Sequence, residues 1–128
     1  MVAAGNKRQW HGEPIKTVNL KHDLPAVSEA LLRLDREIAV ARQDGDALLK
    51  IVHGYGSSGV GGDIRVAVQA RLHEMAEAGQ ICECIFGENW SKSDAATWRL
   101  LQARAELKRD VDLGRGNRGI TIVVLFAS

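Results

Sequence analysis

Residues 47–62 read ALLKIVHGYGSSGVGG, an apolar run followed by a histidine and a glycine-rich loop. Five of the ten residues from His53 to Gly62 are glycines, so the backbone can take positive φ angles and approach a ligand closely. A strand, a glycine loop and a helix N-terminus in this order form an anion site, because free amides and the positive end of the helix dipole point outward. We expect His53 at the mouth of this site, where it can donate, accept or carry charge near neutral pH. An ordinary strand-to-helix turn is the alternative.

The segments on both sides of this stretch alternate between strand and helix patterns. Apolar and polar residues alternate over 15–20, and apolar residues recur at helical spacing from Pro25 to a stop at Asp44-Gly45-Asp46. The same signals predict strands at 47–52, 81–86 and 120–126, a helix from Asp63 to Gly79, and a third helix at 93–111 capped by Ser93 or Asp94. The order βαβαβ(α)β predicts one α/β domain over residues 15–128, preceded by a flexible arm at 1–14.

Composition and charge limit the function. The chain has 128 residues, with 17 Lys+Arg against 16 Asp+Glu and a net charge of +1. Strong nonspecific DNA affinity of the whole surface is therefore excluded, and any nucleic-acid contact needs a local basic patch. No apolar run reaches the roughly 18 residues of a membrane span. The cysteine pair Cys82 and Cys84 fits a reducing compartment, so we predict a cytoplasmic protein in which both thiols are buried core residues and not metal ligands.

A second segment is expected beside the glycine loop. If the first two strands are parallel neighbours joined by the first helix, their carboxyl ends lie side by side at one edge of the sheet. Ligands of open α/β sheets bind outside these ends. Lys21 and His22, which follow the first strand, are therefore predicted to lie close to His53.

The turn before the last strand and the aromatic ring of the loop also suit a polyanion. Arg115 and Arg118 flank glycines, where guanidinium groups are free to meet phosphates. Tyr55 has little to pack against in a glycine loop and is predicted to stack on a base or sugar. Residues 54–59 also match the GxGxxG pattern of dinucleotide-binding folds, but the pattern follows the second strand and too few strands remain for such a domain.

The run IVHGYG at residues 51–56, ahead of a helix, resembles the His-Gly-x-Gly signature of the Smr (small MutS-related) domain. The resemblance covers about residues 15–126, with a strand and helix upstream and a glycine–arginine turn before a valine-rich last strand downstream. It implies a two-layer α/β sandwich similar to the C-terminal domain of the bacterial translation initiation factor three. Asn19 and Lys21 stand where the family signature has aspartate and histidine, and residues 92–112 read as a helical insertion.

The resemblance implies binding to DNA or RNA and, as in several family members, endonuclease nicking of phosphodiester bonds. Catalysis is then assigned to His53, His22 and Lys21, with His53 as general acid or base. The predicted phosphate-binding residues are Gly54, Tyr55, Gly56, Ser57, Ser58, Gly59, Arg115 and Arg118. Because Asn19 lacks a carboxylate, any cleavage is predicted to be weak. A requirement for a divalent metal stays open.

Two alternatives come from other functional classes. The first is a noncatalytic module that binds a small phosphorylated ligand or nucleotide at the same glycine loop. The second is a structural interaction domain that uses Trp90 and Trp98. Neither alternative involves a membrane, and the sequence leaves the oligomeric state open.

Overall fold

The computed structural model describes residues 15–23, 25–55 and 60–126, so the predicted arm at 1–14 lies outside the described residues. The strands are β1 (Lys16–Asn19), β2 (Leu48–Val52), β3 (Glu83–Phe86) and β4 (Ile120–Val124). The helices are α2 (Val27–Asp44), α3 (Val60–Glu77) and α4 (Ala95–Ala103), with short 3-10 helices η1 (Gly87–Asn89) and η2 (Ala105–Arg109). The order of strands and helices is the one that the sequence predicts.

The strands form one mixed sheet in the order β1-β2-β4-β3. β1 runs parallel to β2, with Val18 opposite Ile51, as predicted for two strands joined by a helix. β4 runs antiparallel to both β2 and β3 and lies between them. All five residues of β4 are buried, which explains its nearly unbroken apolar sequence.

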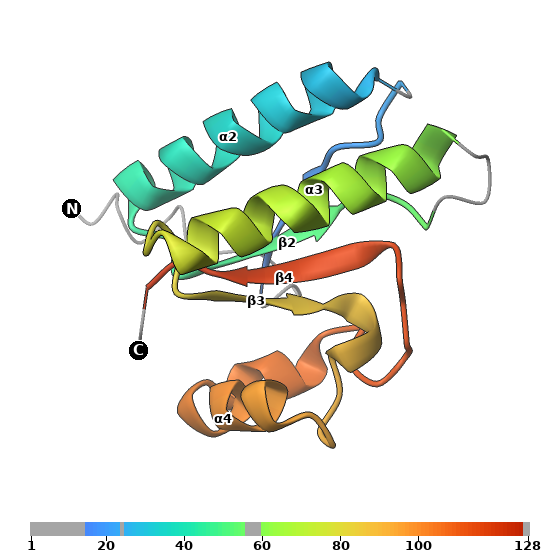
Figure 1. Cartoon of the computed structure of the whole chain (residues 1–128). Coiled ribbons are helices and arrows are strands. Elements are labelled where there is room, and N and C mark those ends of the chain that lie inside the picture. Colours follow the sequence, from blue (N-terminus) through green and yellow to red (C-terminus); the bar gives the residue numbers. More distant parts are fainter. Residues whose placement is uncertain (1–14, 24, 56–59, 127–128) are drawn as a thin grey trace.

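Helices cover both faces of the sheet (Figure 1). α2 and α3 pack on one face, where Leu34, Ile51 and Ile64 belong to one core cluster. α4 and η2 cover the other face, where Trp90 and Leu107 belong to a second cluster. The α/β class is confirmed. In addition to the two expected layers there is a third, smaller layer. It is formed by α4 and η2, which lie within the predicted insertion and cover the second face of the sheet.

Local signals place most element boundaries. Gly45 ends α2 in the left-handed conformation at φ 78°, and its amide donates to carbonyls of the last turn. The Asp94 side chain caps α4 by accepting a hydrogen bond from the Thr97 amide at 3.1 Å. The predicted helix at 93–111 is wrong in its second half. Arg104 leaves the helical conformation, and the chain continues as η2, which brings Leu107 into the core.

The cysteine prediction is wrong in part. Cys82 is exposed and Cys84 is only half-buried, because β3 is an edge strand that begins after Cys82. Across the described ranges, no cluster of three or more His, Cys, Asp or Glu side chains is arranged to hold a metal ion. None of the helices in these ranges has the length and apolar character needed to cross a bilayer.

Candidate functional site

Segments from three parts of the chain meet at the end of the sheet where β1 and β2 finish. The amide of Leu20 donates to the Val52 carbonyl at 2.8 Å. The carbonyl of Gly119, just before β4, accepts hydrogen bonds from the amides of His53 and Gly54 at 3.0 and 3.1 Å. A Cβ placed on Gly54 would lie 3.3 Å from Cδ of Lys21, so the lysine side chain lies against the loop. The predicted proximity of Lys21 to this loop is confirmed.

His53 follows β2 directly, as predicted, but it does not stand at the mouth of the site. Its side chain is 0% exposed because it continues the inward alternation of Leu49 and Ile51 toward α3. Its Nδ1 lies 2.9 Å from the Gly54 carbonyl oxygen, and its Nε2 lies 2.9 Å from Oγ1 of Thr121. Both ring nitrogens are therefore engaged inside the protein.

The hydrogen-bond partners fix the tautomer of His53. A carbonyl only accepts, so Nδ1–H donates to Gly54, and the Thr121 hydroxyl donates to Nε2 of the neutral ring. Gln69 of α3 in turn donates to Oγ1 of Thr121 at 3.3 Å. Burial lowers the pKa of His53, the hydrogen bond to Gly54 opposes this, and the nearby positive charge of Arg65 lowers it further. The ring is thus held neutral as a structural link between β2, β4 and α3.

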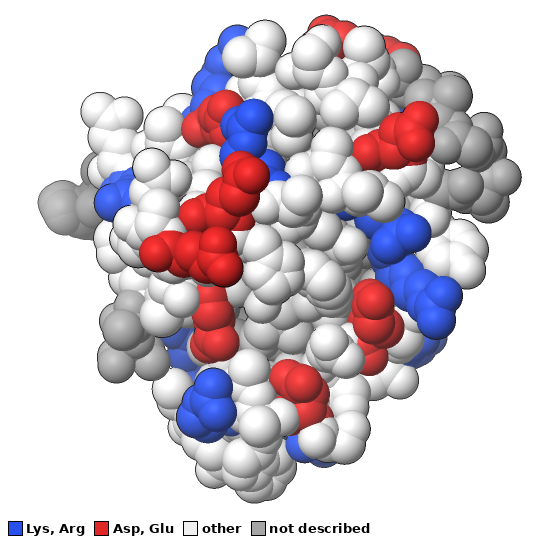
Figure 2. All heavy atoms as spheres, viewed as in Figure 1, with Lys and Arg blue, Asp and Glu red and all other residues white. Residues whose placement is uncertain are grey.

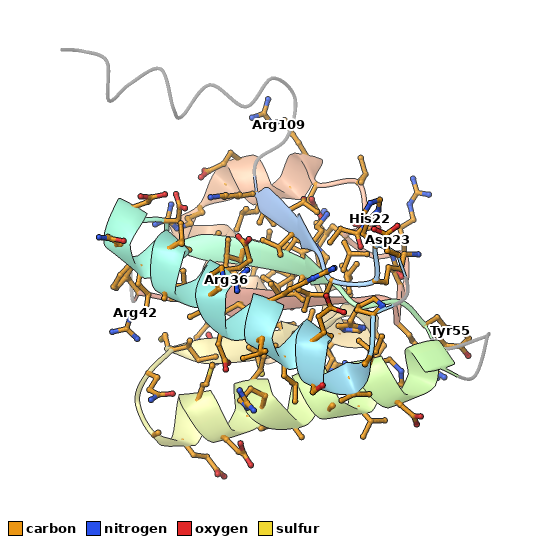
Figure 3. All side chains as sticks on the ribbon, turned by 90° about the horizontal axis from the view of Figure 1, so that it is seen from above. His22, Asp23, Arg36, Arg42, Tyr55 and Arg109 are labelled. Carbon is orange, nitrogen blue, oxygen red and sulfur yellow. The ribbon has the colours of Figure 1, made fainter. Side chains whose placement is uncertain are left out.

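Exposed basic and aromatic side chains lie on the segments that meet around this buried centre. The Tyr55 residue is 55% exposed, and the His22 side chain is 74% exposed and lies 3.5 Å from the carboxylate of Asp23. Figure 3 shows these three residues at one end of the molecule, whereas Arg36, Arg42 and Arg109 lie elsewhere. We call the exposed set Lys21, His22, Tyr55, Arg115 and Arg118 the cationic rim. Residues 56–59 of the predicted site lie outside the described residues.

Charge on the surface is otherwise mixed. On the face seen in Figure 2, acidic side chains form a stripe on the left half, and basic side chains gather at the right edge, on the side where α3 begins. Over the whole chain the two signs nearly balance, with a net charge of +1. A polyanion would therefore be attracted to a local patch.

Arg65 and Gln69 are site residues that sequence reasoning missed. They stand four residues apart on α3 and therefore share the helix face that meets Thr121. The Arg65 Nε atom is buried and has no hydrogen-bond partner among the described residues. The spacing of these polar positions within an otherwise apolar helix face was the available signal.

A buried ionic cluster, which we call the Lys50 network, was also missed. Lys50 lies in the middle of β2 on the α4 side and is only 5% exposed. Its ammonium lies 2.7 Å from Oδ1 of Asp110 and 2.6 Å from Oδ2 of Asp112. Trp90 donates its indole N–H to Asp110 at 2.9 Å, and the Asn117 amide donates to Asp112 at 3.0 Å.

The charges of the Lys50 network are mutually dependent. Burial alone would lower the pKa of Lys50, but its hydrogen bonds to Asp110 and Asp112 raise it above the ordinary value. Burial would also raise the pKa of the Asp112 carboxyl, but hydrogen bonds from Lys50 and Asn117 hold it below its ordinary value. Lys50 and Asp112 are therefore both ionised at neutral pH.

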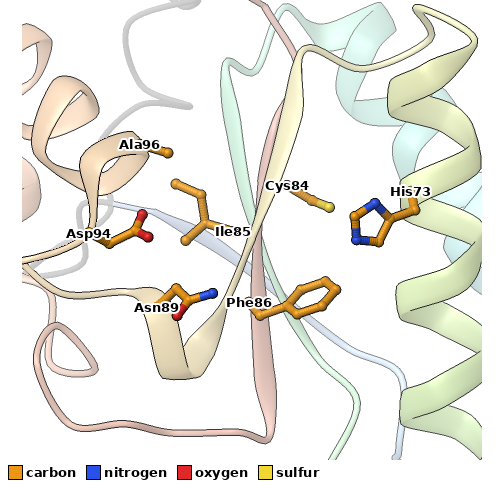
Figure 4. Close-up of a pocket in the computed structure, with 7 residues that line it drawn as sticks. All are labelled: His73, Cys84, Ile85, Phe86, Asn89, Asp94 and Ala96. Carbon is orange, nitrogen blue, oxygen red and sulfur yellow. The ribbon is translucent and has the colours of Figure 1, made fainter.

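A hollow of about 200 Å³ lies along β3 between α3 and α4 (Figure 4). It is lined by His73, Cys84, Ile85, Phe86, Asn89, Asp94 and Ala96. The rings of His73 and Phe86 meet edge to face, with centroids 5.3 Å apart. Burial and the charge of Glu83 raise the pKa of the Cys84 thiol, which therefore stays protonated and weakly nucleophilic. None of the predicted site residues that the structure describes lines this hollow.

Comparisons with known proteins bear on the fold. No family model and no curated protein matches the sequence. The structure is similar to the Smr domain of Thermus thermophilus MutS2, with a TM-score of 0.56 and 23% sequence identity. The match covers 88% of this chain and 100% of the other. The resemblance first seen at His53 and Gly54 thus extends through the arrangement of strands and helices, and the chain has the fold of an Smr domain.

Proposed function

We propose that the protein binds nucleic acid through its phosphate backbone at the cationic rim. The observation that carries this proposal is the hydrogen bonding of the Gly119 carbonyl to the amides of His53 and Gly54. It joins the turn that carries the arginines to the loop that carries Tyr55, and Lys21 lies against the same loop. The likeness to Smr domains, a family associated with DNA and RNA binding, supports the same class of ligand.

The chemistry of the rim suits a flexible or single-stranded polyanion. Arginine guanidinium groups offer paired donors to phosphate oxygens, and lysine offers a point charge. An exposed tyrosine gives a base a surface on which to stack, a contact worth about 1–3 kcal/mol per base. Together these groups hold a phosphate backbone without reading the sequence of bases.

Binding without cleavage is the function that the geometry supports best. The side chain of Asn19 accepts a hydrogen bond from the Lys21 amide at 2.9 Å, so it supports the turn that presents Lys21. His53 is neutral, fully buried and bonded at both nitrogens, which suits a structural role better than proton transfer to a substrate. The assignment of His53, His22 and Lys21 to catalysis stays a prediction of the family resemblance.

Salt dependence of binding tests the interface. We expect binding of a labelled oligonucleotide, followed by fluorescence anisotropy, to weaken with salt at a log–log slope of about −3, since each neutralised phosphate contributes about −0.7 to −0.9. Replacing Arg115 and Arg118 together by alanine removes two contacts and reduces the slope by one to two units. The matched control is Arg36→Ala with Arg109→Ala, which removes the same charge away from His22 and Tyr55. Equal effects of the two pairs would contradict a localised interface.

A nicking assay tests the absence of cleavage. We expect the protein to bind supercoiled DNA and structured RNA without cutting either, with or without divalent metal, because His53 is buried with both ring nitrogens bonded and Asn19 stands in place of the aspartate of the family signature. His22→Ala and His53→Asn are the paired variants. Nicking by the original protein that His22→Ala abolishes would contradict the noncatalytic proposal. Tight binding of a mononucleotide but not of an oligonucleotide would instead favour the small-ligand alternative.

A further inference from the structure

The arginine turn, residues 114–119, is tied to the fold from two sides. On one side, the Gly119 carbonyl accepts from the amides of His53 and Gly54. On the other side, the Gly119 amide donates to Oδ1 of Asn117 at 2.8 Å, and Asn117 donates to Asp112, which Lys50 holds at 2.6 Å. A continuous path of hydrogen bonds therefore runs from the middle of β2 to the end of the turn.

One tie begins at Lys50 within β2, and the other begins at His53, the residue that follows β2. Lys50 pairs with Thr17 of β1 on one side and with Ile122 of β4 on the other, so its backbone is fixed within the sheet. His53 lies three residues after Lys50, and its amide donates a hydrogen bond to the Gly119 carbonyl at the other end of the turn. β2 therefore sets the position of the arginine turn relative to the glycine loop at two points.

Close packing leaves the turn little room on its inner side. A Cβ on Gly119 would lie 3.1 Å from Oδ1 of Asn117 and 3.4 Å from the Tyr55 amide nitrogen. At the start of the turn, the Gly114 amide donates to the Trp90 carbonyl at 2.8 Å. The positive charge of Arg115 also helps to hold the pKa of Asp112 low, after the hydrogen bonds and charge of Lys50 and the hydrogen bond of Asn117.

We propose that Lys50, Asp112 and Asn117 are positioning residues that hold the arginine turn in register with the His53–Tyr55 loop. Arg115, Arg118 and Lys21 then face one stretch of phosphate backbone at the same time. The consequence for binding rests on the proposed nucleic-acid function, whereas the positioning of the turn does not. Lys50 and Asp112 are buried or half-buried, so they act through the turn and do not touch the ligand.

Amide hydrogen exchange in the free protein tests the positioning directly. Asn117→Ala cuts the path between Asp112 and Gly119 while leaving the ion pair of Lys50 and Asp112 intact. We expect the amides of His53 and Gly54 to exchange about three- to tenfold faster, the range for losing one net hydrogen bond, with α2 unchanged. Trp90→Phe is the control, because it removes the indole hydrogen bond to Asp110 and leaves both the path through Asn117 and the backbone bond of the Trp90 carbonyl to Gly114 in place.

Unchanged exchange at His53 and Gly54 in Asn117→Ala would overturn the inference. So would equal acceleration in Trp90→Phe, since it would indicate a general loss of stability. This readout does not depend on a ligand, so failure of the original protein to bind any oligonucleotide would reject the proposed function alone. Where binding is observed, Asn117→Ala should weaken it about three- to tenfold, and less once Arg115 and Arg118 are already alanine.

Discussion

Lys50→Met is expected to lower the free energy of unfolding at pH 7 by about 3–5 kcal/mol, the cost of leaving buried charges without their partner. The carboxylates of Asp110 and Asp112 lie 2.7 and 2.6 Å from the Lys50 ammonium, and only the Asp112 side chain has appreciable exposure, at 20%. Methionine fills a similar volume, so the loss comes from charge and not from a cavity. Urea denaturation of the two proteins measures the difference.

The pH dependence of this loss separates it from poor packing. In the original protein the pKa of Asp112 lies below its ordinary value of 3.8. The stability that the ionised carboxylate contributes is therefore fully present above pH 3.8, and it is lost as the pH falls through the lower pKa of the folded protein. Without Lys50, burial favours the protonated carboxyl, so protonation relieves the variant as the pH falls. The difference between the two proteins should therefore shrink from pH 7 to pH 4. A difference independent of pH would contradict the ionic explanation.

Lys16→Met is the matched control for this substitution. Lys16 lies on the neighbouring strand and pairs with Asp46 at 3.5 Å, but its side chain is partly exposed. Because this lysine is partly solvated and its pair is longer than those of Lys50, its loss should cost less than that of Lys50, on the order of 1 kcal/mol. A loss as large as that of Lys50→Met would show that any lysine of this sheet is equally sensitive.

Gly87→Ala should destabilise the protein by about 3 kcal/mol or more, at or beyond the upper end of the usual cost of overpacking. A Cβ at this position would lie 1.7 Å from the carbonyl oxygen of Asn117 and 2.8 Å from two atoms of Ile120. Two of these three contacts are with backbone oxygens beside β4, which cannot rotate away as a side chain can. Guanidinium denaturation measures the loss, and binding should fall with it because Asn117 supports the arginine turn.

Gly114→Ala is the control for Gly87→Ala, because it adds the same methyl group where there is space for it. Gly114 lies in the same connection to β4 at φ 79°, and a Cβ there would meet nothing within 4 Å. Its cost is therefore only the left-handed backbone strain of a residue with a side chain, about 1–2 kcal/mol. A larger loss at Gly114 than at Gly87 would contradict the steric argument.

The sequence predicted the elements that local patterns determine. The helical spacing before Gly45 and the apolar run before His53 indicated α2 and β2, because periodicity and capping are properties of neighbouring residues. The direction and place of β4 could not be predicted in this way. An apolar strand such as ITIVV is equally compatible with parallel and antiparallel neighbours, so tertiary packing decides.

The proximity of Lys21 to the loop after β2 was predicted from the sequence, but the burial of His53 was not. Parallel pairing of β1 and β2 was enough to place Lys21 beside Gly54. The buried environment of His53 includes Thr121, which lies 68 residues further along the chain, and Gln69, which lies 52 residues before Thr121. No local motif contains all three residues, so the burial of His53 could not be predicted from the sequence. The role of Lys50 could not be predicted for the same reason. Its partners Asp110 and Asp112 are distant in sequence and contact it only in the folded protein.

The place of β4 has a consequence for how the chain folds during synthesis. β3 reaches the rest of the sheet only through β4, so β3 cannot join the pair formed by β1 and β2 until β4 has been synthesised. Until Val124 has emerged, the apolar strand β2 and the short strand β3 both present unpaired edges to other chains. Loops that close over many residues also slow folding. Slow translation of residues 120–124 would therefore extend the period in which these strand edges are open to other chains.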